Sequence, residues 1–230
     1  MLSLIVDVVI PARDERLSLP LVLADLPRAL VRDVVVVDNG SKDGTGDEAA
    51  SLGCVVVREP RRGYGSACLA GLAHLAARFP PPEVVAFLDA DHSDHAEELP
   101  NLLAPLASGR ADLVVGSRAL GTREPGALLP QQRLGNALAT FLIRRLYGVN
   151  VTDLGPFRAI RWDALAGLDM TDRDYGWTAE MQVKALKIGL RYVEVPVSYR
   201  RRAGRSKIAG TLRGTIGAGF KILYTVFRYA

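Results

Sequence analysis

Residues 84–94 read Val84-Val85-Ala86-Phe87-Leu88-Asp89-Ala90-Asp91-His92-Ser93-Asp94, and this stretch decides the fold. A short apolar run is typical of a buried strand, and this one ends in two carboxylates two residues apart. In an open α/β sheet, ligands bind at the edge formed by the carboxyl ends of the strands. Asp89 and Asp91 would repel each other there without a cation, and Mg2+ prefers one or two carboxylates together with phosphate oxygens. The alternative is a solvated acidic loop that follows a strand.

The rest of the chain alternates strand-like and helix-like segments. In the first half, strands are predicted at Leu4–Ile10, Val34–Val37, Cys54–Val57, Val84–Leu88 and Asp112–Val115, and helices at Leu17–Leu30, Asp43–Leu52, Gly63–Phe79 and Ala96–Ala107. Such alternation indicates a parallel sheet with right-handed crossovers. In the second half, helices are predicted at Gln131–Tyr147 and Ala179–Ile188, and strands at Phe157–Ile160 and Arg191–Tyr199. We therefore predict the α/β class, with a mostly parallel central sheet flanked by helices.

The composition is that of a globular protein. Of 230 residues, 49% are hydrophobic and 23% are charged, which suits one large α/β domain. The apolar N-terminal segment contains Asp7 and lacks a basic region, so we expect no signal peptide. No run reaches the ~18 uncharged apolar residues of a membrane span. Cys54 and Cys68, the only cysteines, form neither a disulfide framework nor a zinc site. We expect a cytoplasmic protein.

The net charge of +4 conceals a basic C-terminal block. Residues 191–230 hold nine basic residues and one acid, a net +8, whereas the other 190 residues hold 20 bases and 24 acids, a net −4. Such a block indicates an anionic partner: phosphate, an acidic membrane surface or nucleic acid. Few aromatic residues interleave the basic run, which argues against single-stranded nucleic acid, and we expect no nucleic-acid partner.

Two further strands are predicted to end in acidic residues at the same edge of the sheet. The first continues into Pro11-Ala12-Arg13-Asp14-Glu15, and the second into Asp38-Asn39-Gly40-Ser41-Lys42-Asp43-Gly44-Thr45. A carboxylate there can accept a hydrogen bond from a nucleobase or a ribose, and the small turn-forming residues let a ligand approach the backbone. Gly63-Tyr64-Gly65 opens a predicted helix, where free N–H groups favour phosphate. A tight turn with a helix cap is the alternative at Asp38.

Taken in order, these motifs resemble the family 2 glycosyltransferases, most closely the dolichol-phosphate mannosyltransferase-like branch. The resemblance covers roughly residues 4–210. Beyond the stretches already quoted, it includes Gly116-Ser117-Arg118, Asp153-Leu154-Gly155-Pro156-Phe157-Arg158, Trp177-Thr178-Ala179-Glu180 and Arg202-Ala203-Gly204-Arg205-Ser206-Lys207. It implies a GT-A fold over residues 1–207, with a nucleotide-binding half at about 1–118 and an acceptor half at about 119–207.

The resemblance also implies roles for individual residues. Asp89 and Asp91 would hold Mg2+ or Mn2+ against the diphosphate of a UDP- or GDP-linked sugar. Four residues would act at the reacting groups: Asp91, Arg118, Glu180 and Arg202. The nucleotide-sugar would be bound by Pro11, Ala12, Glu15, Asp38, Asp43, Gly65, Asp89, Ser206 and Lys207. The chain departs from the family pattern at Asn39, where an acid is usual, and at Tyr64, where a lysine is common.

The acceptor is predicted from what the chain lacks. Relatives that act on hydroxyl groups carry an aspartate base near the helix that begins around residue 177, and the corresponding position here is Thr178. A hydroxyl acceptor needs a general base, whereas a phosphate acceptor is already anionic. Glu180 is either a site residue or a carboxylate favoured by the helix dipole. We therefore expect transfer to a polyprenyl phosphate or similar lipid, with a hydroxyl acceptor as the alternative and with inversion implied by the resemblance.

Residues 208–230 are predicted to form a separate amphipathic helix. The apolar residues form one stripe, and Arg213, Lys221 and Arg228 lie about 120° away at ~100° per residue. Such a helix can lie in a membrane interface, so we expect peripheral contact with the inner face of the membrane. The alternative is a helix that packs its stripe on the core. The stripe consists of Ile208, Leu212, Ile216, Phe220, Leu223 and Phe227.

Three other functions are weighed against transfer of a sugar. A nucleotidyltransferase would carry a glycine-rich loop with Arg and Lys after its first strand, and Pro11–Arg16 has none. A catalytically inactive nucleotide-sugar sensor would not need both Asp89 and Asp91. A nucleic-acid binder would use the basic block, which lacks the interleaved aromatic residues. We therefore favour the metal-dependent glycosyltransferase.

Overall fold

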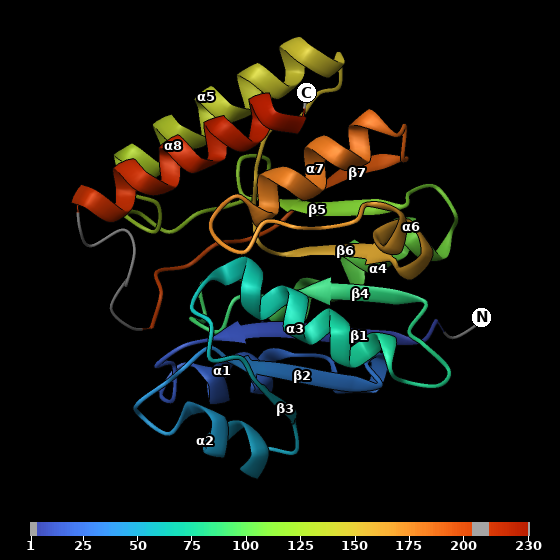
Figure 1. Ribbon diagram of the computed structural model, residues 1–230, viewed down its shortest axis with the longest axis vertical. Helices are drawn as coiled ribbons and strands as arrows, with labels where there is room; N and C mark the ends of the chain where they lie inside the picture. The colour runs from blue at the N-terminus through green and yellow to red at the C-terminus, as the bar shows by residue number, and fades with distance from the viewer. Residues whose placement is uncertain (1–3, 204–211, 230) are drawn as a thin grey trace.

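The computed structural model describes residues 4–203 and 212–229, and a seven-stranded sheet forms its centre (Figure 1). The strand order is β3-β2-β1-β4-β6-β5-β7. Every neighbouring pair is parallel except the two that involve β6, which runs antiparallel to β4 and β5. The predicted α/β class with a mostly parallel sheet is confirmed. The strands are β1 (Val6–Ala12), β2 (Asp33–Asp38), β3 (Val55–Arg58), β4 (Val84–Phe87), β5 (Leu113–Ser117), β6 (Arg158–Arg161) and β7 (Tyr192–Pro196).

Helices cover both faces of the sheet, mostly where the sequence predicts them. The predicted helix over 17–30 is shorter, because Pro27 cannot continue it. Helix α6 has only six residues, too few for a periodic pattern, and was not predicted. The helices are α1 (Leu19–Asp25), α2 (Thr45–Ser51), α3 (Tyr64–Ala76), α4 (Leu99–Ala107), α5 (Pro130–Tyr147), α6 (Trp162–Gly167), α7 (Trp177–Lys187) and α8 (Leu212–Tyr229), with 3-10 turns at Arg28–Leu30 and Ala96–Glu98.

The four valines of β2 show how the sheet forms two cores. Val34 and Val36 point to the face covered by α1, α2 and α4, whereas Val35 and Val37 point to the face covered by α3, α6 and α7. Successive side chains of a strand alternate between faces, so only a strand buried on both sides can be apolar throughout. Burying one such valine contributes roughly 1.5–3 kcal/mol, and the β2 strand is thereby fixed inside the sheet.

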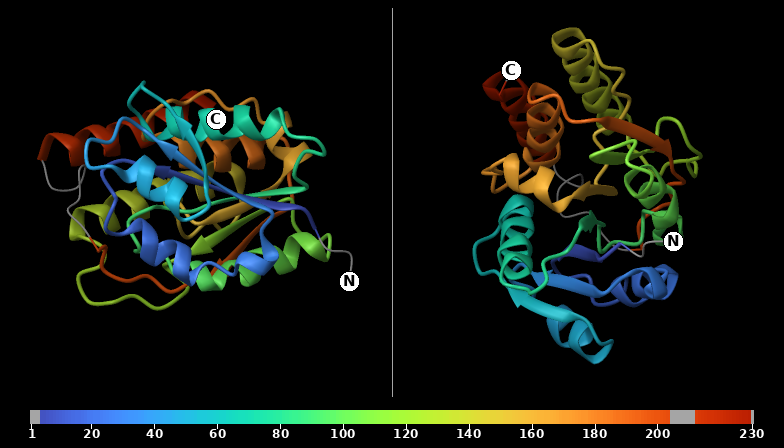
Figure 2. Two further views of the ribbon diagram at one scale, coloured as in Figure 1. Left: turned by 90° about the horizontal axis from the view of Figure 1, so that it is seen from below. Right: turned by 90° about the vertical axis from the view of Figure 1, so that its right-hand side faces the viewer.

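Helices α5 and α8 form a third layer that lies side by side along one end of the molecule (Figure 2). Their buried residues pack with α7 in a small cluster of their own, which includes Ile143 and Val226. The face of α8 that docks is not the predicted apolar stripe, because Val226 is fully buried while the stripe residue Phe227 is 62% exposed. Lys221, predicted on the basic face, instead forms an ion pair with Asp172 at 3.1 Å.

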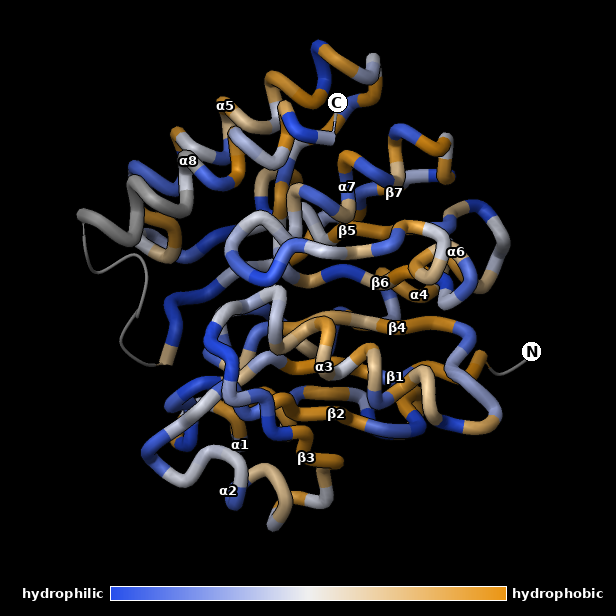
Figure 3. Tube along the Cα trace, in the orientation of Figure 1, coloured by the Kyte–Doolittle hydropathy of each residue, from blue (hydrophilic) through white to orange (hydrophobic). Residues whose placement is uncertain are grey.

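Of the two stripe residues whose side chains the structure describes, Leu223 is half-buried and Phe227 is exposed, so neither is fully packed on the core. The stripe residues Ile208, Leu212, Ile216 and Phe220 lie outside the side chains that the structure describes. Colouring by hydropathy shows apolar residues concentrated along the strands and mixed colours along α5 and α8 (Figure 3). Among the described helices, none combines the length and the apolar character that crossing a bilayer requires.

Candidate functional site

A cavity of about 410 Å3 lies where β1, β2 and β4 end. Parallel strands deliver their following loops to the same edge, so residues that are far apart in the sequence meet there. The cavity brings together six residues predicted to be in the site: Pro11, Ala12, Glu15, Asp89, Asp91 and Arg202. It is also lined by residues that are not among the individually predicted site residues, namely Arg13, Asn39, Arg62, Gly63, Tyr64, Ala90, Asp174 and Tyr175.

Asp89 and Asp91 lie side by side in the cavity wall after β4. Burial, and then the neighbouring charge of Asp91, raise the pKa of Asp89 to about 7. Oδ1 of Asp89 is buried and has no hydrogen-bond partner in the described chain. Oδ1 of Asp91 accepts hydrogen bonds from the amide and the hydroxyl of Ser93, at 2.9 and 2.5 Å. The pair is thus oriented but undercompensated, which favours a bound cation.

Arg202 provides part of that compensation. Its Nη2 lies 3.1 Å from Glu15 Oε1 and 3.3 Å from Asp91 Oδ2, so it joins the loop after β1 to the loop after β4. Ser18 Oγ orients the other Glu15 oxygen by donating a hydrogen bond of 2.6 Å. The backbone amide of Ala203 donates to the Asp91 carbonyl at 2.9 Å, which holds this arginine over the cavity.

A second arginine anchors the same C-terminal segment. Nη2 of Arg200 lies 2.5 Å from Oδ2 of Asp25, and the Arg200 amide donates to the Ser93 carbonyl at 2.9 Å. His92 Nε2 contacts the same Asp25 oxygen at 2.9 Å. The contacts join the end of α1, the loop after β4 and the segment that carries Arg202, so His92 faces protein and not solvent.

The residues after β2 are mainly used to shape turns. Oδ1 of Asp38 accepts from the Ser41 amide at 2.8 Å. Asp43 accepts from the Thr45 and Arg16 amides at 3.0 and 3.1 Å, which ties this turn to the loop after β1. Neither carboxylate lines the cavity that contains Asp89 and Asp91. Asp38 instead lines a separate cavity of about 380 Å3 beside α2.

Asn39, which replaces the usual acid, does line the cavity that contains Asp89 and Asp91. Its Nδ2 donates to the carbonyls of Glu59 and Arg61, and its Oδ1 accepts from the Gly63 amide at 2.9 Å. An amide can make both kinds of contact, whereas a carboxylate only accepts. Asparagine at this position therefore holds the loop that leads into α3 against the cavity.

The amino end of α3 contacts protein where the sequence suggested phosphate. The amides of Gly65 and Ser66 donate to the carbonyls of Asp174 and Arg173, at 3.3 and 2.9 Å. A Cβ at Gly65 would lie 2.0 Å from the Asp172 carbonyl oxygen. The glycine is thus required for close approach of the loop over 172–175, which carries two cavity residues.

Glu180 holds that loop from the other side. It is fully buried, and its oxygens accept from the Thr171 amide at 3.0 Å, the Asp172 amide at 2.7 Å and Lys184 Nζ at 2.8 Å. Burial by itself would raise its pKa, but these bonds outweigh burial and lower the pKa below the usual value. Glu180 does not line the cavity, and its carboxylate positions the loop residues that do.

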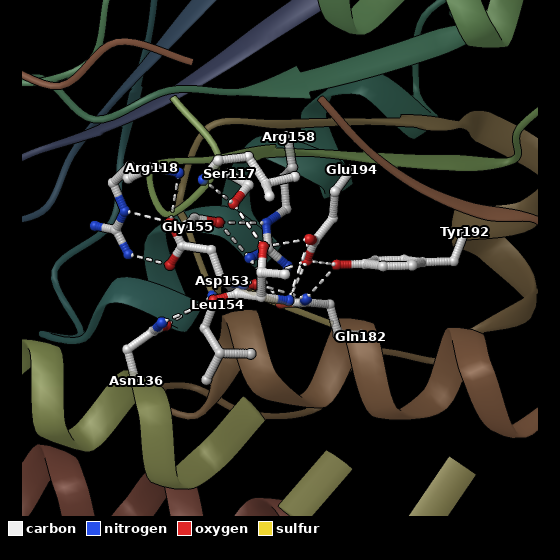
Figure 4. Close-up of polar contacts among 12 residues, drawn as sticks. Ser117, Arg118, Asn136, Asp153, Leu154, Gly155, Arg158, Gln182, Tyr192 and Glu194 are labelled. Carbon is white, nitrogen blue, oxygen red and sulfur yellow. Dashed lines mark hydrogen bonds and ion pairs between the residues drawn. The ribbon is translucent and has the colours of Figure 1, made fainter. Parts of the chain in front are cut away.

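Arg118 belongs to a buried polar network, which Figure 4 shows. Its Nε and Nη2 bind the two oxygens of Asp153, each at 2.7 Å, and its guanidinium lies 5.0 Å from the centre of the Tyr199 ring. Bidentate pairing of this kind fixes the geometry of both partners. Arg118 is not among the residues that line the cavity at the ends of β1, β2 and β4, although its charge is near enough to Asp89 to lower the pKa of that carboxyl.

The rest of the network fixes the loop before β6. Glu194 on β7 accepts from the Thr152 amide at 2.8 Å and from the Tyr192 hydroxyl at 2.6 Å. Arg158, fully buried, donates to the Thr178 carbonyl at 2.9 Å and to the Gly155 carbonyl at 3.1 Å. The motif Asp153–Arg158 therefore acts as a rigid support between the sheet and α7.

The predicted cation site was compared with the side chains present. Across the described residues, no group of three or more His, Cys, Asp or Glu side chains is arranged to hold a metal ion. Two carboxylates, one with an unpartnered buried oxygen, nevertheless fit Mg2+ or Mn2+, which take their remaining ligands from substrate phosphates and water. Ser206 and Lys207 lie outside the described residues.

Several cavity residues escaped prediction although the sequence held a signal for them. Arg13, Asn39 and Tyr64 sit inside the quoted motifs, so their neighbours pointed to the same edge of the sheet. Asp174 and Tyr175 had no such signal, because only the contact between α3 and their loop brings them to the cavity. Burial, and then the charge of Asp174, raise the pKa of Tyr175.

Comparison with known proteins adds independent support. The profile of Glycosyl transferase family 2 matches residues 7–167. A glycosyltransferase of Mycobacterium tuberculosis without assigned substrates is 43% identical over 214 residues, covering 92% of this chain and 93% of the relative. The undecaprenyl-phosphate mannosyltransferase of Micrococcus luteus is 36% identical over 222 residues, covering 90% of this chain and 88% of the relative.

A solved structure shows the same fold. Glucosyl-3-phosphoglycerate synthase of Mycobacterium tuberculosis, crystallised with Mn2+, UDP and glucosyl-3-phosphoglycerate, superposes with a TM-score of 0.78 at 22% identity. The match covers 98% of this chain and 80% of that one. At this identity the likeness establishes the fold and no more.

Proposed function

The chain belongs to glycosyltransferase family 2, and we propose that it moves a hexose from a nucleoside-diphosphate sugar to a polyprenyl phosphate or similar lipid acceptor. That it is a glycosyltransferase follows from the family match and the named relatives. The donor, the metal and the acceptor are our proposal. The single observation that carries it is the cavity in which Asp89, Asp91 and Arg202 meet.

We infer that the donor diphosphate lies against these three residues. Asp89 and Asp91 would hold a divalent cation, which when bound supplies Lewis-acid stabilisation of the departing nucleoside diphosphate. Arg202 adds a guanidinium whose buried Nε lacks a hydrogen-bond partner in the described chain. Such a donor strengthens as charge develops on the leaving phosphate. Mn2+ and UDP in the crystals of the glucosyl-3-phosphoglycerate synthase support this class of donor.

Two observations support a lipid phosphate as the acceptor. The relative that is 36% identical is named for undecaprenyl phosphate. Glu180 is the single acidic residue of α7. Its carboxylate oxygens already accept from Lys184 and from backbone amides, so Glu180 cannot take a proton from a hydroxyl in the cavity. Asp174 lines the cavity and is the residue to test if the acceptor is a hydroxyl. We also propose that residues 1–207 form the glycosyltransferase domain and residues 208–230 a separate helix, with membrane contact through α8.

The donor is tested by thermal shift with UDP-, GDP- and dTDP-sugars, with and without Mn2+. One nucleotide class is expected to raise the melting temperature only when Mn2+ is present, since a ligand that binds the native state stabilises it. Asp91→Asn should abolish both that metal-dependent shift and transfer of sugar, while the protein without ligand still unfolds cooperatively. Exposed Asp163→Asn, a matched change on α6 away from the cavities that Asp91 and Asp38 line, should retain both.

The acceptor is tested by the chemistry of the product. Transfer to a polyprenyl phosphate gives a lipid-extractable, acid-labile sugar phosphate, and Asp174→Asn should retain most of that activity. Transfer to a hydroxyl acceptor, together with loss of activity in Asp174→Asn, would contradict the proposed acceptor. Normal turnover by Asp91→Asn would contradict the proposed cation site.

A further inference from the structure

Helix α5 exposes an apolar stripe that the described chain leaves uncovered. Leu134 is 72% exposed, Phe141 58% and Leu138 45%. Spacings of four and three residues place these side chains on one face of the helix. The opposite face carries Ala139 and Ile143, which are fully buried against α7 and α8. The helix is thus docked by one side and presents leucine and phenylalanine on the other.

A basic flank runs beside this stripe. Arg133 and Arg144 line a second cavity of about 540 Å3, together with Arg123 from the segment before α5. At ~100° per residue, the two helical arginines lie about 80–100° from Leu134 around the helix axis. No ion pair joins any of the three arginines to an acidic side chain of the described chain. Asp153 also lines this cavity, but Arg118 holds its carboxylate.

The neighbouring helix continues the same character. Residues 130–147 and 212–229 contain no Asp or Glu, and each segment contains three basic residues. In the described part of α8, Tyr224 is 48% and Phe227 62% exposed. Both helices begin at the side of the molecule toward which β1 and β4 point (Figure 1), and the cavity that contains Asp89 and Asp91 lies at the ends of these strands. A surface that meets this layer would therefore also lie near the site.

We propose that the outer face of α5 docks on an anionic lipid bilayer. The stripe of Leu134, Leu138 and Phe141 enters the boundary between headgroups and acyl chains, while Arg123, Arg133 and Arg144 receive lipid phosphates. An apolar stripe with a basic flank is the pattern of helices that lie in a membrane interface. The inference deepens the proposed function, on which it rests for the lipid acceptor, and it moves the main membrane contact from α8 to α5.

Charge complementarity favours a bilayer over a second copy of the chain. Two α5 faces packed together would bring six arginines into one interface without a single acid from either helix. Like charges at close range oppose such an association. An anionic bilayer offers the opposite charge, and each basic residue near its surface strengthens binding about fivefold.

The test is co-flotation with vesicles of phosphatidylcholine containing about 30 mol% phosphatidylglycerol at physiological ionic strength. Arg133→Gln with Arg144→Gln should lower the partition coefficient about 25-fold, at roughly fivefold for each charge. Leu134→Gln with Phe141→Gln should lower it at least ~10-fold, because apolar insertion is lost. Vesicles of phosphatidylcholine alone should bind the wild-type protein weakly.

Matched controls remove the same groups elsewhere. Leu17→Gln with Phe79→Gln deletes two apolar side chains that are 85% and 98% exposed, and Arg58→Gln with Arg110→Gln removes two exposed charges. Both controls should partition within about twofold of the wild type, since surface changes away from the docking face touch no lipid. Thermal unfolding of every variant checks that the fold is retained.

Docking is overturned if the α5 variants bind vesicles as tightly as the controls, or if they instead dissociate a dimer in sedimentation velocity with vesicle binding unchanged. Transfer to a water-soluble short-chain prenyl phosphate, measured without vesicles, separates this result from the proposed function. Leu134→Gln with Phe141→Gln should leave that transfer unchanged. If the wild type binds vesicles through α5 but never uses a prenyl phosphate, the proposed acceptor fails and the docking surface stands.

Discussion

At the scale of single residues, one arginine joins parts of the chain that are about 190 positions apart. Arg202 lies within 3.1–3.3 Å of Glu15 and Asp91, and it does so from a segment held to the loop after β4 by two backbone hydrogen bonds. The carboxylates thus have a positive partner before any ligand binds. When a cation and a diphosphate bind, they would replace Arg202 as partners of carboxylates that the fold has already positioned.

Glu180 offers the sharpest test at this scale. Glu180→Gln keeps the size of the side chain but leaves Lys184 and the Asp172 amide without an anionic acceptor. Breaking a buried pair from one side costs about 3 kcal/mol, which corresponds to a fall in melting temperature of roughly 6–12 °C for a chain of this size. The Michaelis constant for the donor should rise too, because Asp174 and Tyr175 lose their support.

Asp47→Asn is the control, since Asp47 pairs at the surface with Arg58 at 3.5 Å. An exposed pair contributes about 1 kcal/mol or less.

The direction of the pH effect on stability at Glu180 is also determined by its pKa. Its folded pKa is lowered, so its contribution is complete above the unfolded value of about 4.3 and is lost as pH falls through the folded value. A difference between wild type and Glu180→Gln that is constant down to pH 3 would contradict this role.

At the scale of elements, the amino end of α3 shows why a correct pattern led to an incomplete interpretation. Gly63 and Gly65 were predicted to admit phosphate, and the structure uses them to admit the backbone of the loop over 172–175. Glycine permits close approach without saying what approaches. The partner is 107 residues away from Ser66 in sequence, and no local pattern reports such a contact.

Gly65→Ala tests this contact. Its Cβ would lie 2.0 Å from the Asp172 carbonyl oxygen and 2.8 Å from the Arg173 carbonyl carbon, and backbone atoms yield little. We expect a loss of about 1–3 kcal/mol in the free energy of unfolding, the usual cost of overpacking, and weaker donor binding. Chemical denaturation and donor titration measure the two effects.

Gly135→Ala in α5 is the matched control. A Cβ there meets nothing within 4 Å. Alanine loses less backbone entropy than glycine when a helix forms, so the change should stabilise the protein by ~1 kcal/mol. Equal stability of the Gly65 and Gly135 variants would show that the loop over 172–175 is free to withdraw from α3.

The elements themselves were largely predictable, and the reason lies in their apolar patterns. The apolar runs Val34–Val37 and Val84–Leu88 predicted buried strands, and the segments of α3 and α5 have long stretches of helical apolar spacing. The antiparallel β6 was placed as a strand without its direction, because direction depends on pairing with β4 and β5. The structure brings together four residues as the motifs implied: Glu15, Asp89, Asp91 and Arg202. The pairing of Arg118 with Asp153 was not predicted, because nothing near Asp153 in the sequence indicates it.

At the scale of the whole molecule, the two large cores and the third layer differ in how they are supported. The sheet is packed on both faces by two extensive clusters, whereas, among the side chains that the structure describes, α5 and α8 rest on a smaller cluster of seven buried residues. Apolar burial sets local stability, so segments with few buried contacts open before the global transition. The layer that we propose for membrane docking is therefore also the least anchored part of the described fold.

Native-state hydrogen exchange tests this order of opening. Amides of α5 should exchange through a sub-global opening with a free energy well below that of β1, β2 and β4, whose amides should exchange only on global unfolding. Anionic vesicles should slow exchange in α5 selectively, because a ligand that binds only the closed state adds its binding free energy to the cost of opening. Equal opening free energies for α5 and β1 would mean that the three layers unfold as one cooperative unit. The small cluster between α5, α7 and α8 would then be as well anchored as the cores beneath it.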